Sequence, residues 1–128
     1  MRRMTLLATG LATVIGGFAS IAPAFAEHGA IAYDRTNCAW GRSWNYDDQR
    51  GADDRAMSEC AAGGSNCQVV ARMGPGECGA VAATNSCSGF GWATRSTVSE
   101  AEIVALQQCR SYNPSLDCAL KTSVCSRR

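Results

Sequence analysis

The eight cysteines of this chain occur as two sets of four in the same order, and this arrangement limits the folds that the chain can form. The first set is Cys38, Cys60, Cys67 and Cys78, and the second is Cys87, Cys109, Cys118 and Cys125. An even number at this density in a short chain is typical of a disulfide framework. Zinc ligands instead come in close pairs, often with histidine. No two cysteines here are that close, so we expect disulfides and no metal site.

The N-terminal segment predicts an oxidising environment for these cysteines. Arg2 and Arg3 precede an uncharged apolar stretch that ends in small residues, the last of which is Ala26. This order is typical of a signal peptide that is cleaved after the small residues. We expect a signal peptide over residues 1–26, a single disulfide-rich domain over residues 27–128, and a secreted or periplasmic location. Glycines within the apolar stretch make a retained membrane anchor the weaker alternative.

The domain expected after cleavage is close to electrically neutral. The chain has 12 basic and 11 acidic residues, and the signal holds two of the basic ones. Nucleic acids and anionic membrane surfaces are bound through basic faces, so near-neutrality argues against both as partners. No second apolar run is long enough to cross a bilayer, so we expect no membrane span after the signal is removed.

The mature chain contains an internal repeat. The sequence Gly-Ala-Ile-Ala at 29–32 recurs as Gly-Ala-Val-Ala at 79–82. A constant shift then aligns Cys60 with Cys109, together with the alanines that precede each of them. Because the cysteines also fall into two sets of four in the same order, we interpret the chain as a duplication. The two half-repeats cover about residues 27–77 and 78–128.

Each half has the pattern of two strands, a helix and a third strand. Apolar runs predict strands at 29–33, 38–44 and 67–73 and at 79–83, 87–93 and 118–125. Helix starts are indicated by Asp47 or Asp48 and by the capping box Thr97–Glu100, and helix ends by Gly63-Gly64 and Asn113-Pro114. We therefore expect an α+β fold with an internally duplicated β-β-α-β unit. A largely antiparallel, disulfide-stapled sheet would carry both helices on one face.

The duplication favours one disulfide scheme among the many that eight cysteines allow. Cys60 with Cys67, and Cys109 with Cys118, would tie each helix end to the following strand. Cys38 with Cys87, and Cys78 with Cys125, would link equivalent positions of the two halves.

Five stretches of the mature chain carry a family resemblance. They are Gly-Ala-Ile-Ala-Tyr at 29–33, Trp-Gly-Arg-Ser-Trp at 40–44, the alanine-rich helix up to Cys60, Cys-Gln-Val-Val at 67–70 and Cys-Gly-Ala-Val-Ala at 78–82. Together they resemble the bacterial secreted family called domain of unknown function 4189, over essentially the whole mature chain. The resemblance implies the fold and an extracytoplasmic location, but no established activity. This chain has more cysteines than many members of that family.

Nothing in the sequence indicates a catalytic site, so we expect no enzymatic activity and no cofactor. The only histidine, His28, comes at the mobile start of the mature chain, where no catalytic triad can be built around it. The acidic residues lack the spacing of a calcium loop and fit a helix cap and an exposed helical face. They are Asp47, Asp48, Asp53, Asp54 and Glu59. The Gly-Phe-Gly-Trp run at 89–92 lacks the pattern of a phosphate loop.

The aromatic residues around the second strand of each half are the candidate binding site. The candidates are Trp40, Arg42, Trp44, Tyr46, Phe90 and Trp92. If their face is open, rings beside Arg42 would suit a glycan or a protein partner. If the face lies beneath the helices, the same rings form the core. The sequence leaves both possibilities open.

The expected function is a non-enzymatic binding or interaction module whose partner is an unknown protein or glycan. Small disulfide-rich scaffolds with rigid loops also serve as hydrolase inhibitors or immunity-type proteins, which is one alternative. A structural, envelope-associated protein without a dedicated ligand is the other.

Overall fold

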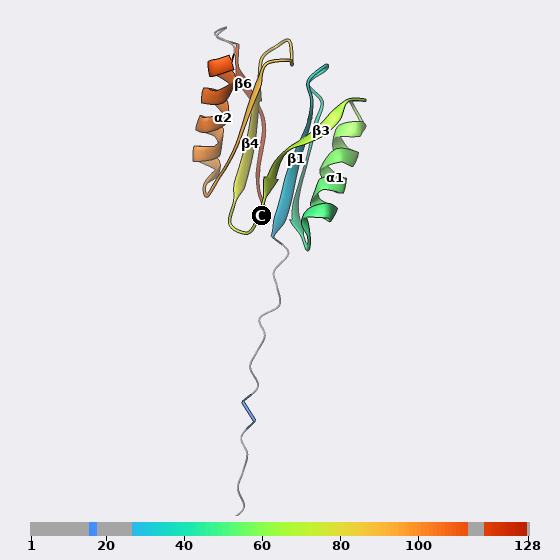
Figure 1. Ribbon diagram of the computed structural model, residues 1–128, viewed down its shortest axis with the longest axis vertical. Coiled ribbons are helices and arrows are strands. Elements are labelled where there is room, and N and C mark those ends of the chain that lie inside the picture. Colours follow the sequence, from blue (N-terminus) through green and yellow to red (C-terminus); the bar gives the residue numbers. More distant parts are fainter. Residues whose placement is uncertain (1–15, 18–26, 113–116, 128) are drawn as a thin grey trace, which may run out of the picture.

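The computed structural model describes residues 16–17, 27–112 and 117–127, and the last two of these ranges fold into two copies of one arrangement (Figure 1). The first copy contains β1 (His28–Asp34), β2 (Trp40–Tyr46), α1 (Gln49–Ala61) and β3 (Cys67–Met73). The second contains β4 (Cys78–Ala83), β5 (Phe90–Arg95), α2 (Val98–Tyr112) and β6 (Ala119–Cys125). The expected β-β-α-β order is confirmed in both halves. The expected signal peptide, except Gly16 and Gly17, and the expected helix end at Asn113-Pro114 lie outside the described residues.

The six strands form two separate antiparallel sheets instead of the single sheet that we expected. In the first sheet β1 lies between β2 and β3, and in the second β4 lies between β5 and β6. The sheets pack against each other, while α1 and α2 cover their opposite outer faces (Figure 1). The α+β class and the duplicated unit are confirmed, whereas the helices lie on opposite sides of a four-layer structure and not on one face.

The two central strands explain this difference because both of their faces are apolar. In β1, Ala30 and Ala32 face α1, whereas Ile31 and Tyr33 face the second sheet. All four side chains are buried, so the sheet needs a helix on one side and another sheet on the other. Strand β4 repeats the pattern, with alanines toward α2 and Val81 toward the first sheet.

The helices approach their sheets closely because small residues make up the contact. The buried helix residues are Ala52, Ala56 and Cys60 in α1 and Ala101, Ala105 and Cys109 in α2. Gly41 of β2 lies beneath α1, and a Cβ added to it would overlap the carbonyl oxygen of Ala56. Gly91 of β5 has the same relation to Ala105. A glycine is therefore required at the same point in each half.

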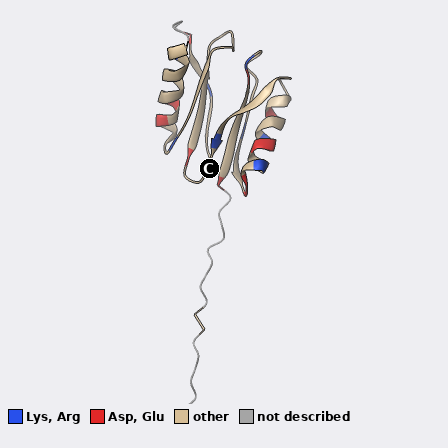
Figure 2. Ribbon diagram, in the orientation of Figure 1, with Lys and Arg blue, Asp and Glu red and all other residues tan. Residues whose placement is uncertain are grey.

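Both helices begin at positions that the sequence predicts as caps. Asp48 Oδ1 accepts the N–H of Gly51 at 2.7 Å, and Thr97 Oγ1 accepts the N–H of Glu100 at 3.2 Å. These bonds satisfy donors that the first turn of a helix leaves without an intrahelical partner. Acidic and basic residues lie together along the outer face of α1, and fewer charges lie on α2 (Figure 2).

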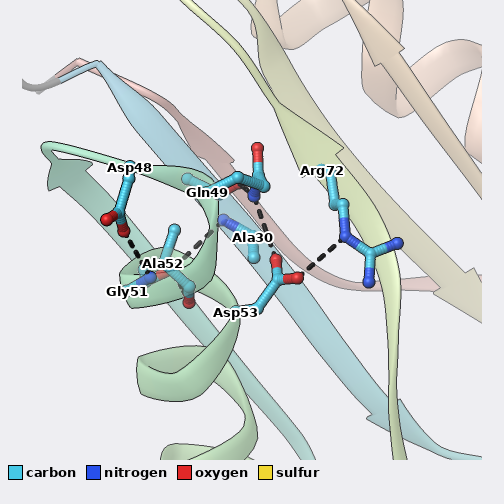
Figure 3. A network of polar contacts seen from close by, with 9 residues as sticks. Ala30, Asp48, Gln49, Gly51, Ala52, Asp53 and Arg72 are labelled. Carbon is cyan, nitrogen blue, oxygen red and sulfur yellow. Dashed lines mark hydrogen bonds and ion pairs between the residues drawn. The ribbon is translucent and has the colours of Figure 1, made fainter.

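A polar network ties the start of α1 to the strands beneath it (Figure 3). Gln49 Nε2 donates to the carbonyl oxygen of Gly29 at 2.9 Å and to Asp53 Oδ1 at 3.0 Å. Asp53 Oδ2 in turn pairs with Arg72 Nε of β3 at 2.9 Å. The sequence predicts Asp53 on the exposed face of the helix. In the structure its carboxylate also joins α1 to β3.

Four disulfides pair all eight cysteines in the scheme that the duplication favours. The pairs are Cys38–Cys87, Cys60–Cys67, Cys78–Cys125 and Cys109–Cys118. Cys38 and Cys87 have positive φ angles of 63° and 69°, so they lie in turns before the second strands instead of beginning them as expected. Cys78 begins β4 and Cys125 ends β6, so their bridge lies within the second half and does not link the two halves as we expected. In a loop-entropy description, each of the two long bridges stabilises the fold by roughly 4 kcal/mol and each short one by about 2.5 kcal/mol.

Asp34 is a fully buried carboxylate at the end of β1. Its Oδ1 accepts bonds from the hydroxyl and the N–H of Thr36 at 2.5 and 2.7 Å, and its Oδ2 accepts the N–H of Asn66 at 2.9 Å. These hydrogen bonds, the Thr36 hydroxyl first, hold the pKa of Asp34 below its ordinary value of 3.8. The ionised carboxylate therefore fastens the turn after β1 to the loop before β3.

Replacing Gly41 by alanine tests the close contact between helix and sheet. We expect Gly41→Ala to lower the free energy of unfolding by about 1–3 kcal/mol or more, because helix α1 must move to admit the methyl group. Gly91→Ala should have an effect of similar size. Gly63→Ala is the control, since its new Cβ would lie 3.6 Å from the nearest atom, the Cβ of Ala39. Urea unfolding measures all three, and equal stability of Gly41→Ala and wild type would contradict the packing.

The buried carboxylate makes stability depend on acid. Because the pKa of Asp34 is lower in the folded than in the unfolded chain, its contribution is present above pH 3.8 and is lost as the pH falls through the folded-state pKa. Asp34→Asn should lower the urea midpoint at neutral pH and flatten its decline below pH 3.8. Asp54→Asn, on the exposed face of α1, is the control. An unchanged pH profile in Asp34→Asn would refute this role.

Candidate functional site

Three of the predicted site residues lie together on the face of β2 that points away from α1. Gly41 and Ser43 point toward the helix, where Ser43 Oγ donates to a helix carbonyl oxygen at 2.6 Å. The alternate residues Trp40, Arg42 and Trp44 therefore face the other way. The guanidinium carbon of Arg42 lies 5.5 Å from the ring centroid of Trp40 and 5.9 Å from that of Trp44, so both rings are within cation–π range.

Arg42 joins the two sheets. Its Nη1 donates to the carbonyl oxygen of Ser123 at 2.9 Å and to Thr122 Oγ1 at 3.4 Å, and both acceptors belong to β6 of the other half. Trp44 is half-buried and packs against the core between the sheets, while Trp40 keeps 40% of its surface exposed. Within this predicted binding face, Arg42 thus contributes to the contact between the halves, and Trp40 is an exposed ring beside it.

Tyr46 packs on the helical side of its sheet, although it lines one hollow together with Arg42 and Trp44. It is half-buried against the cluster beneath α1, and its ring covers Gly51 in the first turn of that helix. A hollow of about 200 Å³ lies next to it. The hollow is lined by Arg42, Ser43, Trp44, Tyr46, Arg55 and Glu59.

A larger cleft lies beside strand β5, and we call it the β5 cleft. It has a volume of about 570 Å³, which falls in the usual range of ligand sites. It is lined by Arg35, Ser88, Gly89, Phe90, Trp92, Gln108 and Tyr112. Trp92 is 42% exposed and Tyr112 is 77% exposed. Of the six predicted site residues, the structure brings Phe90 and Trp92 into this cleft.

Arg35 is an exposed side chain held in a fixed position at one side of the β5 cleft. Its Nε and Nη2 donate to the carbonyl oxygen of Ser88 at 3.2 and 2.9 Å. Its guanidinium carbon lies 5.0 Å from the ring centroid of Phe90, and that ring contacts Tyr33 at a centroid distance of 5.4 Å. Arg35 Nη1 has no partner among the described residues, so it can donate to a ligand.

Tyr33 anchors this stack from within the core. Its hydroxyl donates to the carbonyl oxygen of Cys87 at 2.8 Å, next to the disulfide that joins the halves. Burial raises the pKa of Tyr33 to about 12, so the hydroxyl stays protonated and remains a donor under physiological conditions. Phe90 contacts both Arg35 and Tyr33. The wall of the cleft is therefore supported by a side chain that a buried hydrogen bond holds in place.

Gln108 covers the free edge of β5 on the opposite side of the cleft. Strand β5 is an edge strand, and its ladder to β4 includes a bond from the Thr84 N–H to the Gly89 carbonyl oxygen at 2.8 Å. Since bonded and non-bonded pairs alternate in an antiparallel ladder, the N–H of Trp92 points outward from the sheet. Gln108 Oε1 accepts this N–H at 3.3 Å. The side chain therefore blocks part of an edge that would otherwise be open to pairing.

The same position in the first half has a different side chain. Glu59 Cβ would lie 2.6 Å from a Cβ at Gly41, just as Gln108 Cβ would lie 2.7 Å from one at Gly91, so Glu59 and Gln108 are structural equivalents. Glu59 carries a charge and pairs with Arg55 at 2.6 Å. The two halves share a backbone, but they differ in charge and in the size of the hollow beside the edge strand.

The described residues provide no arrangement suited to metal binding or to thiol chemistry. Among them, no group of three or more His, Cys, Asp or Glu residues is placed to hold a metal ion, and every cysteine is in a disulfide. His28 begins strand β1, opposite Tyr46, and is half-buried, so it does not lie on the mobile end that we expected. Within the described ranges, no helix has the length and apolar character needed to cross a bilayer.

Arg35, Gln108 and Tyr112 line the β5 cleft but are absent from the sequence-based candidates. Arg35 belongs to the first half and reaches the cleft because Cys38, three residues later, is bonded to Cys87 of the second half. Gln108 and Tyr112 come from the last turns of α2. The aromatic pattern located the strand, but only the disulfide and the helix packing bring these side chains beside it.

Comparison with known proteins places the chain among uncharacterised relatives. The protein "Rv1269c" of Mycobacterium tuberculosis and "Mb1300c" of Mycobacterium bovis are each 43% identical over 58 residues, which span 45% of this chain and 43% of the relatives' own length. The solved structure of Rv1813c from Mycobacterium tuberculosis matches 98% of both chains with a TM-score of 0.57 and 26% identity. The family described as domain of unknown function DUF4189 matches residues 28–125. The chain therefore belongs to the DUF4189 family, as its sequence pattern predicted.

Proposed function

We propose that this protein is a non-enzymatic binding module that works outside the cytoplasm and binds its ligand in the β5 cleft. The observation that carries the proposal is the cleft itself, in which exposed aromatic rings adjoin a fixed arginine. Trp, Tyr and Arg are the side chains that most often dominate binding energy. Here they are held by a strand, a helix end and a disulfide-linked turn, so little entropy is lost when a ligand orders them.

An extracytoplasmic location is the second part of the proposal. Four disulfides need an oxidising compartment to form and persist. The proposed cleavage after Ala26 would also leave the folded part intact, since β1 begins at His28. Glu27 pairs with Arg127 near the other end of the chain at 3.5 Å, which would fasten the new N-terminus. Cleavage here would separate an export signal from a domain that begins almost immediately after it.

Expression of the full chain in a bacterial host with an intact secretory pathway tests the location. We expect an exported protein that begins at Glu27 and has all cysteines oxidised, as shown by N-terminal sequencing and by mass with and without reduction. Ala26→Arg should block cleavage, because the peptidase requires a small residue there. Retention of wild type in the cytoplasm with residues 1–26 attached would contradict the proposal.

A pair of exposed tryptophans tests the binding role of the β5 cleft. Trp92→Ala and Trp40→Ala remove rings of nearly equal exposure, 42% and 40%, but only Trp92 lies in the cleft. We expect immobilised wild type and Trp40→Ala to retain the same molecules from separate oligosaccharide and peptide fractions, and Trp92→Ala to retain at least tenfold less. Mass spectrometry identifies what is retained, and urea unfolding checks that both variants fold. Equal retention by all three proteins, or none by any, would refute the proposal.

A further inference from the structure

We propose that the ligand of the β5 cleft is a saccharide that carries a carboxylate. The inference rests on the proposed binding function and adds the class of ligand. Its basis is the combination of a fixed cation, exposed aromatic rings and an amide group around one hollow of about 570 Å³. Each of these groups matches a different part of an acidic sugar.

The charge of the cleft selects an anion. Arg35 is the one charged side chain among the described residues that line it. Two of its nitrogens are bound to Ser88 and its face is stacked on Phe90, so the guanidinium is already in place before a ligand arrives. Nη1 can then donate to a carboxylate oxygen without a large loss of side-chain entropy. An arginine that is fixed in this way and has no carboxylate partner among the described residues suits a ligand that carries a carboxylate.

The rings and the amide of the cleft suit the rest of a sugar. Trp92 and Tyr112 present large exposed surfaces, and a pyranose ring has an apolar C–H face that can cover such a surface. Gln108 Oε1 is engaged by the Trp92 N–H, which leaves the two Nε2 hydrogens as donors to hydroxyl oxygens. Apolar stacking combined with a few fixed polar groups is the usual composition of a small-ligand site.

A peptide that extends the sheet is the competing occupant, and Gln108 argues against it. Such a peptide must bond to the outward N–H and carbonyl groups of β5. The outward N–H of Trp92, in the middle of that edge, is already bonded to Gln108. An added strand would have to displace this side chain, whereas a saccharide can use it as a donor.

The first half supplies an internal control for the role of charge. Glu59, the equivalent of Gln108, places a carboxylate beside the edge of β2, where the hollow is also smaller. The two arginines of that hollow already have partners within the chain, since Arg55 pairs with Glu59 and Arg42 donates to β6. The proposed site therefore lies at the edge of β5 and not at that of β2, and the change Gln108→Glu would give the β5 cleft the carboxylate of its counterpart.

Titration with short oligomers of glucuronic and galacturonic acid, followed by NMR, tests the assignment. The chain has three tryptophans, so each indole N–H gives one signal, and Trp40 and Trp44 serve as internal references. We expect the Trp92 indole signal to shift and the other two to remain. The methyl esters of the same oligomers, which lack the charge, should bind at least tenfold more weakly. Raising the salt from about 0.01 M to about 1 M should also weaken binding of the acids.

Substitutions at Gln108, Arg35 and Glu59 test the effect of charge on binding separately from the effect of packing. Gln108→Glu keeps an acceptor for the Trp92 N–H but adds a negative charge, and we expect it to weaken binding of the uronate oligomers by about tenfold or more. Arg35→Gln should have an effect of similar size. Glu59→Gln, the mirror change in the first half, should leave the affinity unchanged. Urea unfolding of each variant shows whether it is folded.

Each outcome of these titrations either supports or overturns the inference about the ligand. Absence of a Trp92 shift with every uronate overturns the inference, and so does equal binding of acids and esters. A shift with acetate alone that matches the shift with the oligomers would show that the site binds simple carboxylates and not a saccharide. If neutral sugars or peptides bind in a Trp92-dependent manner, the inference fails while the proposed binding function stands. If no ligand of any fraction depends on Trp92, both fail.

Discussion

The close contact between each helix and its sheet is the constraint on which the rest of this structure depends. Alanine, glycine and cysteine make up that contact, and Gly41 and Gly91 leave no space for even one methyl group. Since these small residues occupy one face of each central strand, the larger ones, such as Ile31 and Val81, must be buried on the other face. The second sheet supplies that burial. The four layers follow from the distribution of side-chain size within two short strands.

The contact between the two halves determines where the candidate site lies. The disulfide Cys38–Cys87 joins two turns that follow equivalent strands, and Arg35 consequently reaches Ser88 and Phe90 of the other half. Arg42 of β2 also reaches the second half, where it donates to β6, and in doing so uses its guanidinium within the structure. Two arginines thus reach from the first half to the second. Arg42 holds the two sheets together, and Arg35 lines an open cleft.

The two halves provide two similar sheet edges, and the side chains at these edges differ. The backbone around Gly41 and Gly91 is equivalent, yet Glu59 lies at one edge and Gln108 at the other. The acidic edge has its charge engaged by Arg55 and retains only a small hollow. The uncharged edge adjoins Tyr112 and the larger cleft. One half can therefore act mainly in stability while the other carries the proposed binding site.

The sequence by itself determined the local elements, the repeated unit and the favoured cysteine pairing, because these follow from short-range periodicity, capping residues and matched spacing. The family was indicated by the resemblance of five stretches to its members. The sequence also located Trp92 and Phe90 on the strand that borders the cleft. It could not decide between one sheet and two, since alternation along β1 shows that both faces are apolar but not what covers them. Only the tertiary structure decided that Arg42 connects β2 to β6, and that Arg35 keeps Nη1 without a partner among the described residues. That distinction depends on which strand and turn of the other half come within hydrogen-bond distance, and such contacts leave no pattern in the sequence.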